Sequence, residues 1–77
     1  MKIFDEIKEI LVKELAIDKE LVTQDAHLQD DLDADSIALV TLAEILGNRY
    51  KLELSIDDLV DAETVGELVQ IIESKLS

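Results

Sequence analysis

The chain has 77 residues, which is enough for one hydrophobic core, so we expect a single domain spanning residues 1–77. Hydrophobic residues make up 48% of it, cysteine is absent, and the aromatic residues are Phe4 and Tyr50, so aliphatic packing must stabilise the fold without disulfides. Nineteen acidic residues against seven basic ones give a formal net charge of −12, which makes nucleic acid and anionic lipid poor partners and on its own could serve only solubility. A protein partner with basic docking patches is favoured instead.

No apolar run approaches the roughly 20 residues that cross a bilayer. The first fifteen residues alternate charged with apolar positions, unlike a signal peptide. We therefore expect a cytoplasmic, monomeric protein that does not insert into membranes.

The beginning of the chain predicts an amphipathic helix over the first fifteen residues, with charged residues, Glu6 among them, on the outer face. Its apolar residues recur at steps of three and four: Ile3, Phe4, Ile7, Ile10, Leu11 and Leu15. Residues 16–35 then lack a sustained period and predict a long, ordered loop. The apolar residues expected to anchor this loop are Ile17, Leu21, Val22, Leu28 and Leu32.

A second helix is predicted from Ser36 to Tyr50, because apolar residues again follow a helical period. Asp35 and Ser36 are both residue types that cap a helix N-terminus, while Gly47 and Asn48 weaken the last turn. The expected buried stripe is Leu39, Leu42, Ala43, Leu46 and Tyr50.

The remainder predicts an extended connector over 51–55, a short helix and a final helix. Ser55 and Asp58 form a capping-box pattern that opens a short helix ending at Asp61, and Thr64 and Glu67 form another before the last helix. The apolar face of that last helix is Val65, Leu68, Val69, Ile72 and Leu76. The predicted fold class is all-α, a small bundle of three main helices plus one short helix.

The acids at 31, 33 and 35 have the one-three-five spacing of a calcium-binding loop. That interpretation fails because position six is Ser36 instead of Gly and position twelve is Leu42 instead of Glu. We expect no specific metal site, only weak divalent cation binding from charge density.

Ser36 has little support as a catalytic nucleophile. His27 is the only imidazole base available, no Gly-x-Ser-x-Gly motif surrounds the serine, and a small helical domain offers little cleft. We predict a non-enzyme in which His27 faces solvent from the loop. Two interpretations of Ser36 remain: an N-cap serine, which the local context favours, or a site for a phosphate ester at a helix N-terminus.

The segment Asp-Asp-Leu-Asp-Ala-Asp-Ser-Ile at 30–37 resembles the signature of acyl carrier proteins, and Val22-Thr23 and Thr64-Val65 extend the resemblance along the chain. It implies an acyl-carrier-like fold, with 4′-phosphopantetheine transferred from coenzyme A to Ser36 by a phosphopantetheinyl transferase. It further implies that Asp35 supports this transfer and that the arm carries acyl groups as thioesters.

The resemblance also implies that the second helix binds acyl-transferring and chain-elongating enzymes. The residues expected on this surface are Ile37, Val40, Thr41, Glu44 and Ile45.

The chain departs from the family pattern at three places. Asp33 stands where the family commonly has Gly, and Ile37 replaces the usual Leu. The exposed face of the second helix, which is usually acidic, carries Glu44 as its only acid and ends in Arg49 and Lys51. Its other expected positions are Ala38, Thr41, Ile45, Gly47 and Asn48.

Three functional hypotheses follow from these features. The first is a carrier of type II fatty acid biosynthesis. The second is a specialised carrier of a polyketide, nonribosomal peptide or modified-lipid pathway, which the unusual second helix keeps open. The third is a helical interaction module without an arm.

Overall fold

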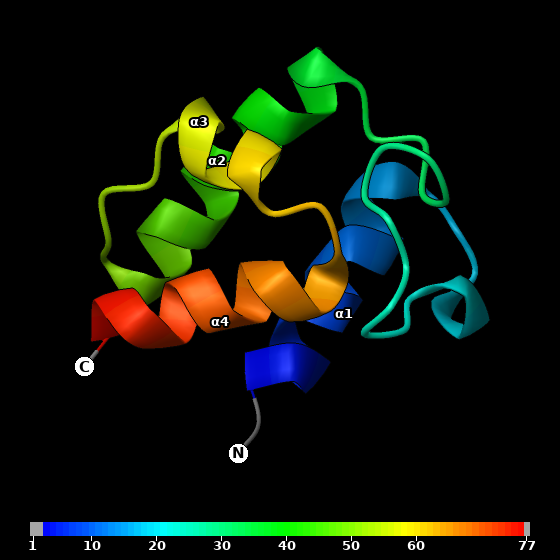
Figure 1. Ribbon diagram of the computed structural model, residues 1–77, viewed down its shortest axis with the longest axis horizontal. Helices are drawn as coiled ribbons and strands as arrows, with labels where there is room; N and C mark the ends of the chain where they lie inside the picture. Colours follow the sequence, from blue (N-terminus) through cyan, green and yellow to red (C-terminus); the bar gives the residue numbers. More distant parts are fainter. Residues whose placement is uncertain (1–2, 77) are drawn as a thin grey trace.

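The computed structural model describes residues 3–76, and this part of the chain folds as a helical bundle (Figure 1). Its elements are α1 (Ile3–Leu15), the 3₁₀ turn η1 (Lys19–Leu21), α2 (Ser36–Tyr50), α3 (Ile56–Asp61) and α4 (Val65–Leu76). The all-α fold class and all four helices are confirmed, although positions 1 and 2 of the first predicted helix lie outside the described residues. The turn η1 lies inside the long loop and was not predicted. The connector at 51–55 is not a strand, as expected. No helix among residues 3–76 is long and apolar enough to span a membrane.

The helices pack around an aliphatic core. α2 lies against α1 and α3, and α4 packs against α1 and α3 (Figure 1). The large side chains that are fully buried come from every helix and from the loop: Ile7, Leu11, Val22, Leu28, Leu32, Leu39, Leu42, Leu46, Leu59, Val65, Leu68 and Ile72. The apolar stripes predicted from the helical period therefore form the core or pack against it, except that Leu76, which was predicted on the apolar face of the last helix, is exposed.

The long loop is anchored by fewer residues than predicted. Val22, Leu28 and Leu32 are buried and Ile17 is partly buried, but the Leu21 side chain is 51% exposed. Leu21 ends η1 while Val22 has extended backbone angles, so the two neighbouring side chains leave the chain in different directions. Only Val22 can then reach the core.

A polar cluster joins the N-terminal helix to the end of α2. The Tyr50 hydroxyl donates a hydrogen bond of 2.6 Å to Glu6 Oε1, and Arg49 Nε lies 3.7 Å from the same oxygen. Glu6 is buried, so its prediction on the outer face was wrong. Burial and the adjacent Glu6 carboxylate raise the pKa of Tyr50 to about 12. The two partners satisfy a carboxylate that the apolar surroundings would otherwise penalise.

Gly47 was expected on the exposed face of α2, but it is buried. A Cβ atom at this position would lie 2.9 Å from the carbonyl oxygen of Leu52, so the connector can approach α2 only because residue 47 is glycine. The C-terminal end of α2 is also capped by backbone hydrogen bonds. Lys51 adopts a left-handed conformation with φ 57°, and the N–H groups of Lys51 and Leu52 both donate to the Gly47 carbonyl.

The two predicted capping boxes have different outcomes. At α3 the box is confirmed: Ser55 Oγ accepts from the Asp58 N–H, and Asp58 Oδ2 accepts from the Ser55 N–H. At α4, Thr64 Oγ1 accepts from the Glu67 N–H, as predicted. The Glu67 carboxylate, however, accepts from the N–H of Glu63, one residue before the expected donor.

Candidate functional site

Asp35 caps the start of α2, so the hydroxyl of Ser36 is not used as the helix cap. Asp35 has extended backbone angles, and its Oδ1 accepts a 2.8 Å hydrogen bond from the Ala38 N–H. Ser36 is therefore the first residue inside the helix and is exposed, which corrects the interpretation of this serine as the N-cap. In the part of the chain that the structure describes, no hydrogen bond engages its hydroxyl.

The loop before Ser36 has a defined shape. The His27 carbonyl accepts from the N–H groups of Asp31 and Leu32, and the Leu28 carbonyl accepts from Ala34 at 2.9 Å. Leu32 and Ala34 are buried. These contacts fix the backbone that delivers Ser36 to the surface.

Asp33 lies between these two buried residues and has a left-handed backbone with φ 59°. Glycine adopts this conformation without steric cost, and aspartate adopts it more readily than most residues. The departure of this position from the family's Gly therefore has a structural cost.

Other polar residues near the site are solvent-facing. His27 is exposed, as predicted, while its backbone pairs with that of Thr64 in an isolated antiparallel bridge. The carboxylates at 30, 31, 33 and 35 are all exposed. Among residues 3–76 no group of three or more His, Cys, Asp or Glu side chains is arranged to hold a metal ion.

The residues expected to contact partners share one face of α2. Ile37 and Val40 are the most exposed large apolar residues of this helix, with exposed fractions of 77% and 45%. Thr41 and Glu44 continue the face at helical spacing and are exposed, while Ile45 is half-buried. The structure thus brings four of these five residues together on the surface that follows Ser36.

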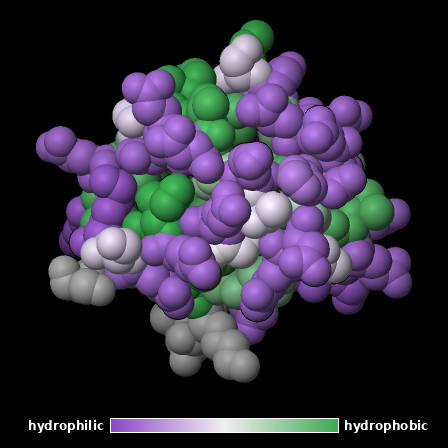
Figure 2. Space-filling model, in the orientation of Figure 1, coloured by the Kyte–Doolittle hydropathy of each residue, from purple (hydrophilic) through white to green (hydrophobic). Residues whose placement is uncertain are grey.

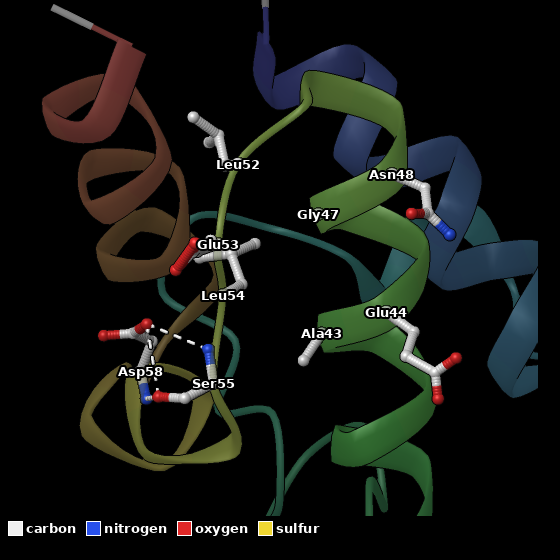
Figure 3. Close-up of a pocket in the computed structure, with 9 residues that line it drawn as sticks. All are labelled: Ala43, Glu44, Gly47, Asn48, Leu52, Glu53, Leu54, Ser55 and Asp58. Carbon is white, nitrogen blue, oxygen red and sulfur yellow. Dashed lines mark hydrogen bonds between the residues drawn. The ribbon is translucent and has the colours of Figure 1, made fainter.

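A surface hollow lies between α2 and the connector that leads into α3 (Figure 3). Its volume is about 440 Å³. Ala43 points from α2 toward the connector, which carries Leu54, whereas the carboxylate of Glu44 points to the other side of the helix (Figure 3). Among the residues of α2 that line the hollow, Ala43 is nearest to Ser36 in sequence. It lies seven positions beyond Ser36, or roughly 10 Å along α2 at 1.5 Å per residue. Sequence reasoning missed this hollow because it depends on how closely the connector approaches α2 at Gly47.

The start of α2 thus presents an exposed serine directly after the aspartate that caps the helix. The family model described as "Phosphopantetheine attachment site" matches residues 5–72. The chain therefore belongs to the phosphopantetheine-binding carrier family.

Curated relatives align with nearly the whole chain, and they support the same family. It is 38% identical over 73 residues to an acyl carrier protein of Lactobacillus johnsonii, covering 95% of this chain and 91% of that protein. It is 39% identical over 75 residues to an acyl carrier protein of Thermotoga maritima, covering 97% and 93%, respectively. An acyl carrier protein of Petrotoga mobilis is 36% identical over 76 residues, covering 99% and 89%. Within its family, the chain groups with acyl carrier proteins: it is a carrier and not an enzyme, and its prosthetic group is covalent 4′-phosphopantetheine.

Proposed function

We propose that Ser36 is the attachment point of the phosphopantetheine arm. Its Oγ attacks the phosphorus that bears the pantetheine group of coenzyme A, and the bond from that phosphorus to 3′,5′-adenosine diphosphate breaks. The hydroxyl proton passes to a base of the transferase. The observation that carries this proposal is that Asp35 caps α2 and leaves the exposed Ser36 hydroxyl without an intramolecular partner in residues 3–76.

The first turn of α2 also suits a phosphate ester. Asp35 accepts hydrogen bonds from two backbone N–H groups near the start of α2. Its side chain accepts from the Ala38 N–H, and its carbonyl accepts from the Leu39 N–H. The N–H groups of Ser36 and Ile37 precede these in the turn, at the positive end of the helix dipole. A phosphodiester on Ser36 would lie beside them. The arm supplies a thiol that holds acyl groups as thioesters.

Asp35 has two separable roles in this proposal. One carboxylate oxygen caps α2, and the exposed carboxylate supports transfer by helping to bind the metal of the transferase. Asp35→Asn keeps an oxygen that can cap the helix but removes the charge. We expect this variant to keep the thermal stability of the wild type and to load more slowly. Equal loading rates for Asp35→Asn and the wild type would contradict a role of the Asp35 carboxylate in the transfer.

The pathway that best fits the family and its curated relatives is type II fatty acid biosynthesis, with residues 1–77 acting as one monomeric, cytoplasmic carrier domain. Its partners would be the phosphopantetheinyl transferase and the acyl-transferring and chain-elongating enzymes. They would contact the α2 face formed by Ile37, Val40, Thr41, Glu44 and Ile45.

A specialised carrier of a polyketide, nonribosomal peptide or modified-lipid pathway is the second candidate. It is favoured by a specific observation, which is that this α2 face exposes one acid and two large apolar side chains.

Intact mass spectrometry tests the attachment. The unmodified chain is incubated with coenzyme A and a broad-specificity phosphopantetheinyl transferase, and we expect a gain of one phosphopantetheine on the wild type and none on Ser36→Ala. Absence of the gain on the wild type, or its persistence in Ser36→Ala, would contradict the proposal and, in the first case, favour an armless interaction module.

The modified wild type then separates the two pathways. Efficient malonyl loading by a malonyl transferase of fatty acid synthesis supports a carrier of type II fatty acid biosynthesis. Failure to load, with an unchanged circular dichroism spectrum, supports the specialised carrier.

A further inference from the structure

Residues 27–32 form a closed turn in the loop that leads to Ser36. The His27 carbonyl accepts hydrogen bonds from the N–H groups of Asp31 and Leu32, at 2.9 and 3.0 Å. The Asp31 side chain closes the turn in the opposite direction, because its Oδ2 accepts from the His27 N–H at 2.8 Å. Asp31 is therefore bonded to His27 through both its backbone and its carboxylate.

The beginning of this turn is anchored beside α4. The Leu28 N–H donates to the Glu63 carbonyl at 3.0 Å, and His27 pairs with Thr64 in the isolated antiparallel bridge. Two more backbone hydrogen bonds join residues 24–26 to the start of α4. His27 and Leu28 are thus held against another element of the bundle, and the Asp31 carboxylate ties the later part of the turn to them.

The end of the turn leads directly to the start of α2. Ala34 is buried, and its N–H donates to the Leu28 carbonyl at 2.9 Å. Asp35 follows and caps the helix that begins with Ser36. Because Asp31 precedes Asp35 by four positions, a turn that opens at Asp31 frees the backbone that holds both the cap and the serine.

Asp31 differs in this bond from the acids around it. Figure 2 shows hydrophilic side chains over much of the side of the molecule where Figure 1 places the loop. The neighbouring carboxylates of Asp30 and Asp33 are exposed, and within residues 3–76 they have no hydrogen bond or ion pair. These acids contribute charge alone, whereas the Asp31 carboxylate also holds a backbone N–H.

Resting on the carrier function proposed above, we propose that Asp31 is a positioning residue for the transfer of phosphopantetheine to Ser36. Its carboxylate acts through the backbone: the bond to His27 keeps the turn closed, and the closed turn orients Asp35 and Ser36 for the transferase. The charge of Asp31 is not required for this role, because an uncharged side-chain oxygen can accept from the same N–H. A displacement of about 1 Å at a reacting group can lower a rate by roughly 100-fold, so partial opening of the turn is enough to slow the transfer.

The experiment measures kcat and KM of a broad-specificity phosphopantetheinyl transferase for unmodified carrier variants, with saturating coenzyme A, at low and moderate salt. Asp31→Ala removes both the charge and the hydrogen bond, and Asp31→Asn removes the charge but keeps an oxygen that can accept. Asp30→Ala and Asp30→Asn are the matched controls, because they remove an exposed charge that holds no backbone group. Circular dichroism melts identify a temperature at which every variant is folded.

We expect Asp31→Ala to lower kcat about three- to tenfold at both salt concentrations, a factor that corresponds to the net contribution of one hydrogen bond. Asp31→Asn and both Asp30 variants should keep kcat within about twofold of the wild type. Loss of one charge can change KM, but it should do so to a similar extent for Asp31→Asn and Asp30→Asn, and less at moderate salt.

Amide hydrogen exchange followed by NMR tests the link through the backbone. The Ala34 N–H, which bonds to Leu28 in the same loop, should exchange faster in Asp31→Ala than in the wild type and at the wild-type rate in Asp31→Asn. If Asp31→Ala does not fold, Asp31→Ser takes its place, since its shorter side chain weakens the bond to His27. Its kcat should then fall by a smaller factor, about two- to threefold.

Equal kcat values for Asp31→Ala and Asp30→Ala would overturn the proposal even if Ser36 is modified. A loss of kcat in Asp31→Asn as large as in Asp31→Ala would also overturn it, because the charge and not the hydrogen bond would then be responsible. Unchanged exchange of the Ala34 N–H in Asp31→Ala would show that the turn does not depend on this bond, which is a third refuting result. Lack of any modification of the wild type would instead contradict the carrier function, so the two proposals fail by different results.

Discussion

Asp33 offers a direct test of how the loop delivers Ser36. Its φ of 59° places an L-residue in the left-handed region, which costs about 1–2 kcal/mol for a residue with a Cβ and less for aspartate. Neighbouring Ala34 is buried and hydrogen-bonded to Leu28, so the backbone cannot easily relax. We expect Asp33→Gly to raise the free energy of unfolding by about 0.5–1 kcal/mol. For a chain of this size that is an increase in Tm of roughly 2–8 °C.

Two further variants separate conformation from charge. Asp33→Asn removes the same carboxylate while keeping a side chain that tolerates the left-handed region, and Asp33→Ala removes the charge but not the Cβ penalty. Urea and thermal unfolding followed by circular dichroism should rank stability as Gly above Asn above Ala. A Gly variant no more stable than the Asn variant would refute the conformational argument. Ala16→Gly, at φ 54° after the end of α1, tests the same reasoning without a charge change, and no gain in Tm there would also count against it.

The remaining predictions concern the polar cluster, the acidic loop and the connector. Tyr50→Phe should lower the free energy of unfolding by about 1–2 kcal/mol, because a buried carboxylate loses a donor. Since the pKa of Tyr50 is raised to about 12, its contribution is complete below about pH 10 and is lost as pH rises toward 12; wild-type melts that show no such loss would contradict this. Repulsion within the 30–35 acids predicts that NaCl and MgCl₂ raise the Tm, and melts insensitive to both would show that repulsion is unimportant. Gly47→Ala should lower the free energy of unfolding by about 1–3 kcal/mol, because its Cβ would meet the Leu52 carbonyl. Asn48→Ala, at the next and exposed position, should not lower it. Equal stability of the two variants would contradict a steric conflict at residue 47.

Local patterns accounted for the helices and much of their capping. The Ser36–Tyr50 helix and the Ser55–Asp58 capping box follow from residues within one or two turns of each other. The identity of Ser36 as the candidate attachment residue came from the match of 30–37 and of the whole chain to a family. Its local context favoured only a helix cap, and Asp35 takes that role.

The sequence by itself therefore determined the all-helical class and the helix bounds, because helical periodicity and capping act over three to four residues. The position of the candidate serine came from the match of the sequence to a family. Tertiary structure alone decided that Glu6 is buried against Tyr50, 44 residues away, and that Gly47 lies under the connector. It also decided that Val60 of α3 lies beside the loop that precedes Ser36. Such pairings depend on how the helices pack in space, which no spacing within a single helix specifies.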